Sequence, residues 1–284
     1  KLHKNFSSVE FVPFAGDMMT SRWAYEAIMV SQFKDNKYEK HFFDIEKEIS
    51  YNSFKCNYLI PDLVSKIDKC ENILADAAKK EELQRNLLIL FNEITKIHNS
   101  EYDKEFKYLD ELKPEKFTAQ TAEKLRTYLD KVKKFFSKQL SARESDKDNK
   151  YKELVEKFGS KEALEEFKKN YHNENVANIC LNAQEIRKTC EENNQIVQTM
   201  NPIFKDPSSK IGRAHMYAPV KRLFGLKIDT YWFNIAFIWL TTIMMYFVLS
   251  FNLLKRGLDY LENMKLFKVV KKISSNKPGK NEKD

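Results

Sequence analysis

The sequence predicts an all-α protein, in which a coiled-coil-like helical bundle is joined to one C-terminal transmembrane helix. Three observations lead to this fold class. Gly and Pro are scarce, at 6 and 7 among 284 residues, and 32% of the residues are charged, a composition that favours helices over β-sandwiches. Apolar residues in the middle of the chain recur at steps of three and four, the spacing of one helix face. Near the C-terminus, 24 consecutive residues carry no charge, enough to cross a bilayer.

We expect the bundle over residues 46–204, after a first segment over residues 1–45. Three long apolar series carry this prediction. They are Leu63, Ile67, Cys70, Leu74 and Ala77, continued by Leu83, Leu87, Leu90, Ile94 and Ile97; Ala122, Leu125, Leu129, Val132 and Phe136; and Val176, Ile179, Ala183, Ile186, Cys190, Val197 and Met200. The first series skips near Lys79–Glu82, which predicts a bend or register shift within one helix.

Local signals place the helix ends within the bundle. Pro61 suits the first turn of the first helix, and Thr118 suits the N-cap of the second. Shorter helices are expected over Tyr151–Phe158 and Lys161–Tyr171, broken at Gly159. The helices should pack antiparallel around one core, with their charged faces in solvent.

The membrane helix is expected over residues 231–254. Trp232 lies at its start, where aromatic side chains sit at the membrane interface. Its polar members include Asn234, Thr241 and Thr242, groups that often face other membrane helices. The alternative is a buried helix of a soluble core, but the length and the lack of charge argue against it. Residues 205–230, with their prolines and glycines, read as an irregular return to the membrane.

The net charge of +8 is concentrated in a basic tail, residues 255–284. That segment holds nine Lys/Arg and four Asp/Glu, so it carries +5 and the other 254 residues carry +3. A nucleic-acid groove needs a basic patch on the folded body, so we expect no nucleic-acid partner. Both flanks of the membrane helix are basic, and the positive-inside rule slightly favours a cytoplasmic C-terminus. The last residues, GKNEKD, are expected to be disordered.

No motif for catalysis, cofactor binding or metal binding is present in the sequence. The phosphate-binding loop G-x-x-x-x-G-K-[ST], the zinc motif H-E-x-x-H, paired C-x-x-C and the nucleophile elbow are all absent. The five histidines are scattered and show no ligand spacing. We therefore expect no catalytic residue, cofactor or metal in this chain, which alone is not a complete enzyme.

The four cysteines leave two interpretations open. Cys180 and Cys190 are expected on one helix, ten residues or about 15 Å apart, too far to bond each other. Cys70 is in reach of either across the bundle, so a Cys70–Cys180 disulfide is permitted outside the cytoplasm. The preferred alternative is that the cysteines are small core residues.

The segment Thr20–Phe33 reads as an apolar helix that begins with a hydroxyl cap. Arg22 and Glu26 are four residues apart, so they share a face and can pair with each other or with an adjoining surface. Trp23 lies beside them. The residues alone leave two alternatives level: a helix packed on the bundle, or a helix in the membrane interface.

Two stretches of the chain resemble a known family. They are VPFAGDMMTSRWAYEAIMVSQF, at residues 12–33, and GRAHMYAPVKRLFGLKIDTYWFNIAFIWLTTIMMYFVL, at residues 212–249. Both resemble the C-terminal end of the permease in ABC transporters of the white/pleiotropic-drug-resistance type, especially Bacteroidetes versions that fuse ATPase and permease. The resemblance covers about residues 6–45 and 205–256. The long helical insertion between them departs from the short loops of eukaryotic relatives.

The resemblance implies a place in a transporter. The helix with Arg22, Trp23 and Glu26 would be the short interfacial or re-entrant helix that opens the extracytoplasmic segment between the last two membrane helices. ATP and Mg²⁺ would bind a cytoplasmic domain outside this chain, and the permease would form a homodimer in membrane lipid, in the bacterial inner membrane. The bundle would be an extracytoplasmic (periplasmic) domain that gates export or docks partners, and the C-terminus would be cytoplasmic. Because the first residue is Lys1, we expect a processed chain or a piece of a longer one.

Two alternative functions stay open. The chain could be a single-span membrane-anchored sensor whose bundle binds a ligand, although only about 30 residues follow the membrane helix. It could also be a coiled-coil tether with no role in transport, in which Thr20–Phe33 would be a helix of the soluble domain.

Overall fold

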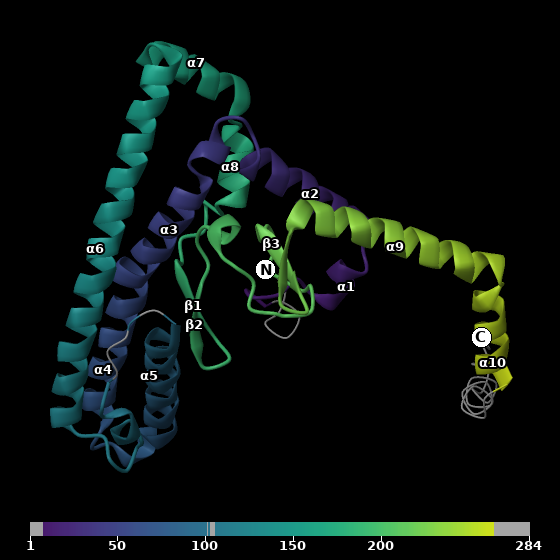
Figure 1. Ribbon diagram of the computed structural model, residues 1–284. Helices are drawn as coiled ribbons and strands as arrows, with labels where there is room; N and C mark the ends of the chain where they lie inside the picture. The colour runs from purple at the N-terminus through teal and green to yellow at the C-terminus, as the bar shows by residue number, and fades with distance from the viewer. Residues whose placement is uncertain (1–7, 101, 103–105, 264–284) are drawn as a thin grey trace, which may run out of the picture. The chain divides into compact units, whose positions relative to one another are not determined.

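The computed structural model describes residues 8–100, 102 and 106–263 (Figure 1). The chain divides into two units, Lys1–Asn234 and Ile235–Asp284, and each is described by itself. The helices of the first unit are α1 (Phe14–Asp17), α2 (Thr20–Lys34), α3 (Phe43–Phe54), α4 (Ile60–Ile73), α5 (Lys80–Ser100), α6 (Ala119–Phe158), α7 (Lys161–Tyr171) and α8 (Glu174–Cys180). Its strands are β1 (Thr189–Glu192), β2 (Gln195–Gln198), β3 (Val220–Leu223) and β4 (Leu226–Asp229), followed by α9 (Thr230–Ser250), which crosses the boundary between the units.

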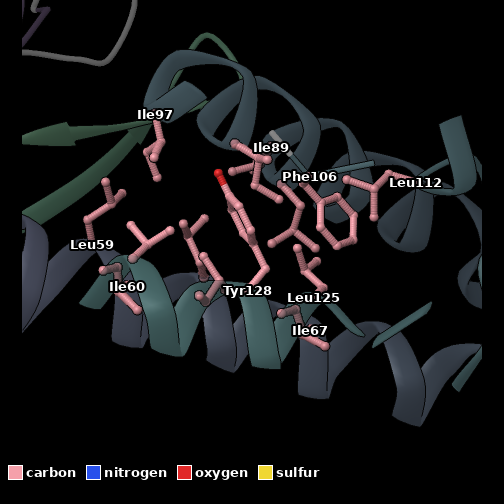
Figure 2. Close-up of a cluster of buried hydrophobic side chains, with 14 of the residues drawn as sticks. Leu59, Ile60, Ile67, Ile89, Ile97, Phe106, Leu112, Leu125 and Tyr128 are labelled. Atoms are coloured by element: carbon pink, nitrogen blue, oxygen red, sulfur yellow. The ribbon is translucent and has the colours of Figure 1, made fainter. Parts of the chain in front are cut away.

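The helical core of the first unit is built by α4, α5 and α6. Figure 2 shows side chains from these helices converging, with Phe106 and Leu112 from the α5–α6 connection. The core includes most residues of the first two apolar series, and Leu63, Ile67, Leu90 and Leu125 are fully buried, whereas Leu74 is 38% exposed. Burying an aliphatic side chain of this size stabilises a fold by about 1.5–3 kcal/mol. A helical bundle is therefore present in this part of the chain, but α4 and α5 take the place of the one long helix that the first series predicted.

A proline lies inside a continuous helical run that joins α3 to α4. The five residues Lys55–Leu59 form a π-helical turn between the two α-helices, and Pro61 lies in the first turn of α4. Proline has no N–H to donate to the carbonyl four residues earlier, and its ring crowds that carbonyl. A π turn widens the helix locally, which lets the chain pass Pro61 without breaking. Pro61 thus occupies the expected first turn, but the helical run begins well before it.

Two predictions about helix continuity were wrong. The skip near Lys79–Glu82 is a chain reversal, because α4 ends at Ile73, a 3₁₀ turn covers Ala77–Lys79 and α5 then runs back along α4. The break expected before Tyr151 is absent, because α6 runs unbroken for 40 residues. Its predicted ends are correct: the Thr118 hydroxyl accepts the Thr121 N–H at 3.2 Å, and Gly159 closes the helix with φ +84°.

The third apolar series is mostly not helical, so the all-α prediction is only partly right. The chain is mostly helical, but α8 ends at Cys180 and is followed by the antiparallel β1–β2 hairpin. Asn193 and Asn194 form the two-residue turn, both with positive φ near 50–56°, as a type I′ turn requires. Ile196 and Val197 of β2 are both buried, on opposite faces of the hairpin. β3 and β4 form a second antiparallel hairpin within the segment predicted as irregular, residues 205–230.

The helix α9 matches the predicted membrane helix. Among the described residues it is the one helix long and apolar enough to cross a membrane, and 6% of its most apolar 18-residue window is buried. It ends at Ser250, four residues before the predicted end, because Asn252 takes a positive φ of 50° and starts a new helix, α10 (Leu253–Asn263). The rest of the predicted basic tail, with GKNEKD, lies outside the described residues.

Candidate functional site at the start of the membrane helix

Apolar side chains of α2 pack inside the first unit, some of them in a buried cluster with residues of other elements. Trp23, Ala27, Val30 and Phe33 are each at most 4% exposed. Phe33 packs edge-on against the ring of Phe204 at 5.8 Å between centroids. The hydroxyl cap predicted for this helix is absent, because Thr20 is the first helical residue and no side chain caps the end. Packing on the first unit therefore accounts for most of the apolar face of this helix.

Glu26 is the centre of a buried polar cluster on α2. Its side chain is 0% exposed, and its carboxylate accepts three hydrogen bonds. Lys221 of β3 donates from Nζ at 2.7 Å, and Arg22 donates from Nη1 at 2.9 Å. Lys221 is itself 1% exposed. A buried carboxylate persists as an ion only when it is paired and hydrogen-bonded in this way.

Asn234 adds the first turns of α9 to the same cluster. Its Nδ2 donates to Oε2 of Glu26 and to the backbone oxygen of Trp23, both at 3.0 Å, and its side chain is buried. Thr230, the first residue of α9, donates its hydroxyl proton to the Ala218 oxygen at 2.6 Å. The polar residue predicted to face other membrane helices is therefore held by α2.

A second layer surrounds Arg22. Its guanidinium also pairs with Asp17 of α1 at 2.8 Å and lies 3.7 Å from the centroid of the Trp23 ring. The Trp23 Nε1 donates to the backbone oxygen of Asp17 at 2.8 Å. Arg213 pairs with the other Asp17 oxygen at 2.9 Å. The cluster thus joins α1, α2, β3 and α9, with anions and cations facing each other.

Burial sets the electrostatics of this cluster. Loss of water around the Lys221 ammonium lowers its pKa, and the Glu26 carboxylate opposes that effect. Burial likewise lowers the pKa of Arg22, against the pull of Glu26 and Asp17. The arrangement holds no nucleophile with an adjacent base, and the described residues contain no group of three or more His, Cys, Asp or Glu that could hold a metal ion. Its chemistry is that of a polar clamp, which fixes the start of α9 to three other elements.

The predicted residues fall into two groups in the structure. Arg22, Trp23, Glu26 and Asn234 come together in the cluster. Trp232 is 67% exposed. The hydroxyls of Thr241 and Thr242 both donate to the Ile238 oxygen of their own helix at 2.8 Å, as hydroxyls in apolar helices commonly do.

Sequence reasoning missed Lys221, Asp17 and Arg213. From the sequence, Lys221 and Arg213 are two of the basic residues on the N-terminal flank of the membrane helix. One signal was present: Lys221 follows the apolar run Ala218–Val220, and a charge in such a segment needs a buried partner if the segment is buried. On β3 the buried Lys221 lies between half-buried neighbours. The sequence predicts no strand in this segment, so it does not predict that the Lys221 side chain is buried.

The structure does not bring Cys70 and Cys180 together. Cys70 belongs to the α4–α6 core, whereas Cys180 belongs to a separate cluster with Met29 and Phe33. All four cysteines are free, and Cys190 is exposed on β1. Cys180 and Cys190 therefore do not share a helix, and the thiol of Cys180 lies 3.7 Å from the Met29 oxygen. The placement fits the interpretation of buried cysteines as small core residues.

No protein-family model, curated protein or solved structure matches this chain.

Proposed function

We propose that this chain is the permease part of an ATP-driven ABC exporter: a helical domain outside the cytoplasm, followed by the last membrane helix. The observation that carries the proposal is the polar clamp between residues far apart in the sequence. Glu26 and Lys221 are 195 residues apart, and Trp23 and Asn234 are 211 residues apart. These pairs join the two stretches that resemble the permease family, with the helical insertion between them.

The geometry gives this resemblance a physical basis. In the family, the interfacial helix and the last membrane helix belong to one continuous permease. Here, the insertion leaves after α2 and returns through β3 to the same cluster. An insertion whose two ends meet in space can be large without disturbing the element that receives it. The contact between α2 and the first turns of α9 is therefore the family-like part, and residues 46–204 are the addition.

In this function, ATP hydrolysis takes place in a cytoplasmic domain outside this chain, and two permeases form the translocation path. The clamp would make the helical domain and the start of α9 move as one body. The buried pair of Glu26 and Lys221 resists separation, because moving one partner away leaves the other charge buried and unpaired. The domain can then gate export or dock partners by moving with α9.

The native reading frame tests the exporter assignment. We expect several hundred residues before Lys1, with a glycine-rich phosphate-binding loop and further apolar spans. An export assay on the full-length protein then tests the clamp: export per molecule of protein in the membrane should fall for Glu26→Gln, whereas the surface variant Asp146→Asn should leave it unchanged. A native gene that begins near Lys1 would contradict the exporter and leave the tether as the function to test.

One observation favours the membrane-anchored sensor as a second candidate. A groove of about 1230 Å³ lies in the first unit, with Arg22, Lys66, Arg85 and His215 among its lining residues. Its volume exceeds the range of about 300–1,000 Å³ that is typical of small-molecule sites, so a small molecule has room to bind there. A sensor would bind its ligand there with the bundle intact and without ATP hydrolysis, so ligand-dependent thermal stabilisation of the isolated chain would favour it.

A further inference from the structure

The tip of the β3–β4 hairpin exposes three large apolar side chains. Phe224 is 87% exposed, Ile211 74% and Leu226 69%. Single exposed apolar residues are ordinary, but a group gathered at one tip marks an interaction site.

The backbone at this tip is well ordered by hydrogen bonds, so the exposure is a feature of the fold. The Gly212 N–H donates to the Arg222 oxygen at 2.6 Å, and the Phe224 N–H donates to the Lys210 oxygen at 3.1 Å. Ile211 forms a β-bridge with Leu223. Gly225 takes φ +90° at the turn, and a Cβ added there would meet no atom within 4 Å. This backbone conformation lets the chain reverse and project Phe224 outward.

The charged side chains of the hairpin tip itself are basic, and the acidic residue Asp206 lies at the base of the hairpin. Every charged residue from position 207 to position 228 is a Lys or Arg. Asp206, at the base of the hairpin, pairs with Lys227 at 3.0 Å and with Arg222 at 3.6 Å. Lys210 lies on the exposed side of the tip. Apolar side chains with flanking cations suit the headgroup region of an anionic bilayer, because the rings and chains enter the acyl boundary while the cations meet phosphate.

The hairpin is also tied to the candidate membrane helix. β4 ends at Asp229 and α9 begins at Thr230. The Thr230 N–H donates to the Pro219 oxygen at 3.2 Å, just before β3 begins. The base of the hairpin is thus held at the point where the chain enters α9.

We propose that the tip formed by residues 210–211 and 224–227 inserts into the headgroup region of an anionic bilayer. This is a second membrane contact, separate from the span and from the predicted interfacial helix α2. It rests on α9 crossing the membrane, and it does not depend on the exporter assignment. The occupant of the apolar tip is lipid, and a second copy of the chain is the alternative that the experiment must exclude.

The test uses an environment-sensitive fluorophore on one exposed cysteine in the full chain, in a Cys190→Ser background in which the other native cysteines are buried. The reporter position is Phe224→Cys. The matched control is Ile186→Cys, which is 91% exposed and lies in the loop after α8. Met244→Cys, in α9, reports the span itself. The protein is reconstituted into vesicles of phosphatidylcholine with phosphatidylglycerol, with and without nitroxide-labelled lipid.

We expect the label at position 224 to shift to the blue and to be quenched by nitroxide lipid several-fold more than the label at 186. Lys210→Glu should weaken that quenching in vesicles with phosphatidylglycerol and leave it unchanged in phosphatidylcholine alone. Quenching at 244 without quenching at 224 would overturn the proposal while the span stands. A blue shift at 224 that lacks lipid quenching and rises with protein density would also overturn it, in favour of a second copy. Absence of quenching at both 224 and 244 would remove the membrane assignment and the proposal together.

Discussion

Replacing Glu26 by Gln should destabilise the first unit more than almost any single polar substitution in this chain. The change keeps the shape and removes the charge that compensates Lys221, which is 1% exposed. Breaking a buried pair by removing one partner costs about 3–5 kcal/mol. A second estimate agrees. If the unpaired Lys221 ammonium gives up its proton instead, neutralising a lysine of ordinary pKa, about 10.4, at pH 7 costs about 4.6 kcal/mol. Arg22 retains Asp17 as a partner, so it adds little.

The complementary variants separate the pair from its surroundings. Lys221→Met leaves Glu26 with two donors, Arg22 and Asn234, so we expect a loss of about 2–3 kcal/mol. The double variant removes the stranded charge and should lie within about 2 kcal/mol of the parent. The two single losses together exceed that by at least about 3 kcal/mol, which is the expected coupling energy.

The assay is urea unfolding in mild detergent, followed by the fluorescence of Trp23, which is 4% exposed beside the pair. Trp232 and Trp239 are replaced by Phe in every variant. The control is Asp146→Asn, which breaks a surface pair with Arg143 at 2.8 Å, with side chains 48% and 38% exposed; it should change stability by less than about 0.5 kcal/mol. If Glu26→Gln were as mild as this control, or if the two single changes simply added, the clamp would not exist in solution.

Three further predictions follow from backbone, proton and thiol chemistry. Gly212→Ala should lower stability by about 2–4 kcal/mol, because the residue has φ +74° and its new Cβ would lie 2.6 Å from the Phe233 ring. The control Gly225→Ala has φ +90° but open space around it, so it should lose only about 1–2 kcal/mol. Equal losses of the two variants in thermal melts would refute the contact between position 212 and the Phe233 ring. Burial raises the pKa of Glu39 from 4.5 to about 7, with Glu46 adding to the effect, so the folded state holds a proton that the unfolded chain has released. The free energy of unfolding should therefore fall by about 2–3 kcal/mol as pH rises from about 4.5 to about 7, and a Glu39→Gln variant that keeps the same pH dependence would contradict this origin. Maleimide should modify one thiol of the folded chain, that of Cys190, and four after denaturation, counted by mass; a missing pair of thiols after denaturation without reductant would instead indicate a disulfide among the buried cysteines, Cys56, Cys70 and Cys180.

Sequence reasoning located the helices whose apolar pattern is long and regular. α2 spans Thr20–Lys34 where Thr20–Phe33 was predicted, α7 has its predicted ends, and α9 starts one residue early. The ends of α6 and α7 carry strong local signals: Gly159 is the C-cap of α6, and the Ser160 hydroxyl accepts the Ala163 N–H at 3.1 Å at the start of α7. Local propensity and packing agree there.

The errors arose where the same apolar spacing fits either one long helix or a helix followed by another element. Val176, Ile179 and Ala183 fit a helix, and the apolar spacing continued through chance to Val197. Asn193 and Asn194 lie within this third series, although two adjacent asparagines, which accept positive φ, are a hairpin turn signal. The reversal between α4 and α5 looked like a register shift, because the two helices share one core and so repeat one pattern.

Only the pair of Arg22 and Glu26 in the polar cluster could be predicted from the sequence. The spacing of Arg22 and Glu26 indicated a shared helix face, and the structure pairs them at 2.9 Å. Lys221 and Asn234 reach Glu26 from about 200 residues away, and no local pattern encodes such a contact. The resemblance to permeases predicts that both stretches belong to the same part of a protein. It does not predict the ion pair between them, which only the three-dimensional structure shows.

The side of the membrane on which the helical unit lies is the most direct test of the proposed function. Cys190 is the exposed native thiol of that unit, and Gly257→Cys in a Cys190→Ser background places a thiol on α10, where nothing lies within 4 Å of the new Cβ. Spheroplasts are treated with a membrane-impermeant maleimide before and after lysis. We predict that Cys190 reacts in intact spheroplasts and that the thiol at position 257 reacts only after lysis. Reaction of both thiols in intact spheroplasts, or the reverse order, would contradict an extracytoplasmic domain held by one membrane helix.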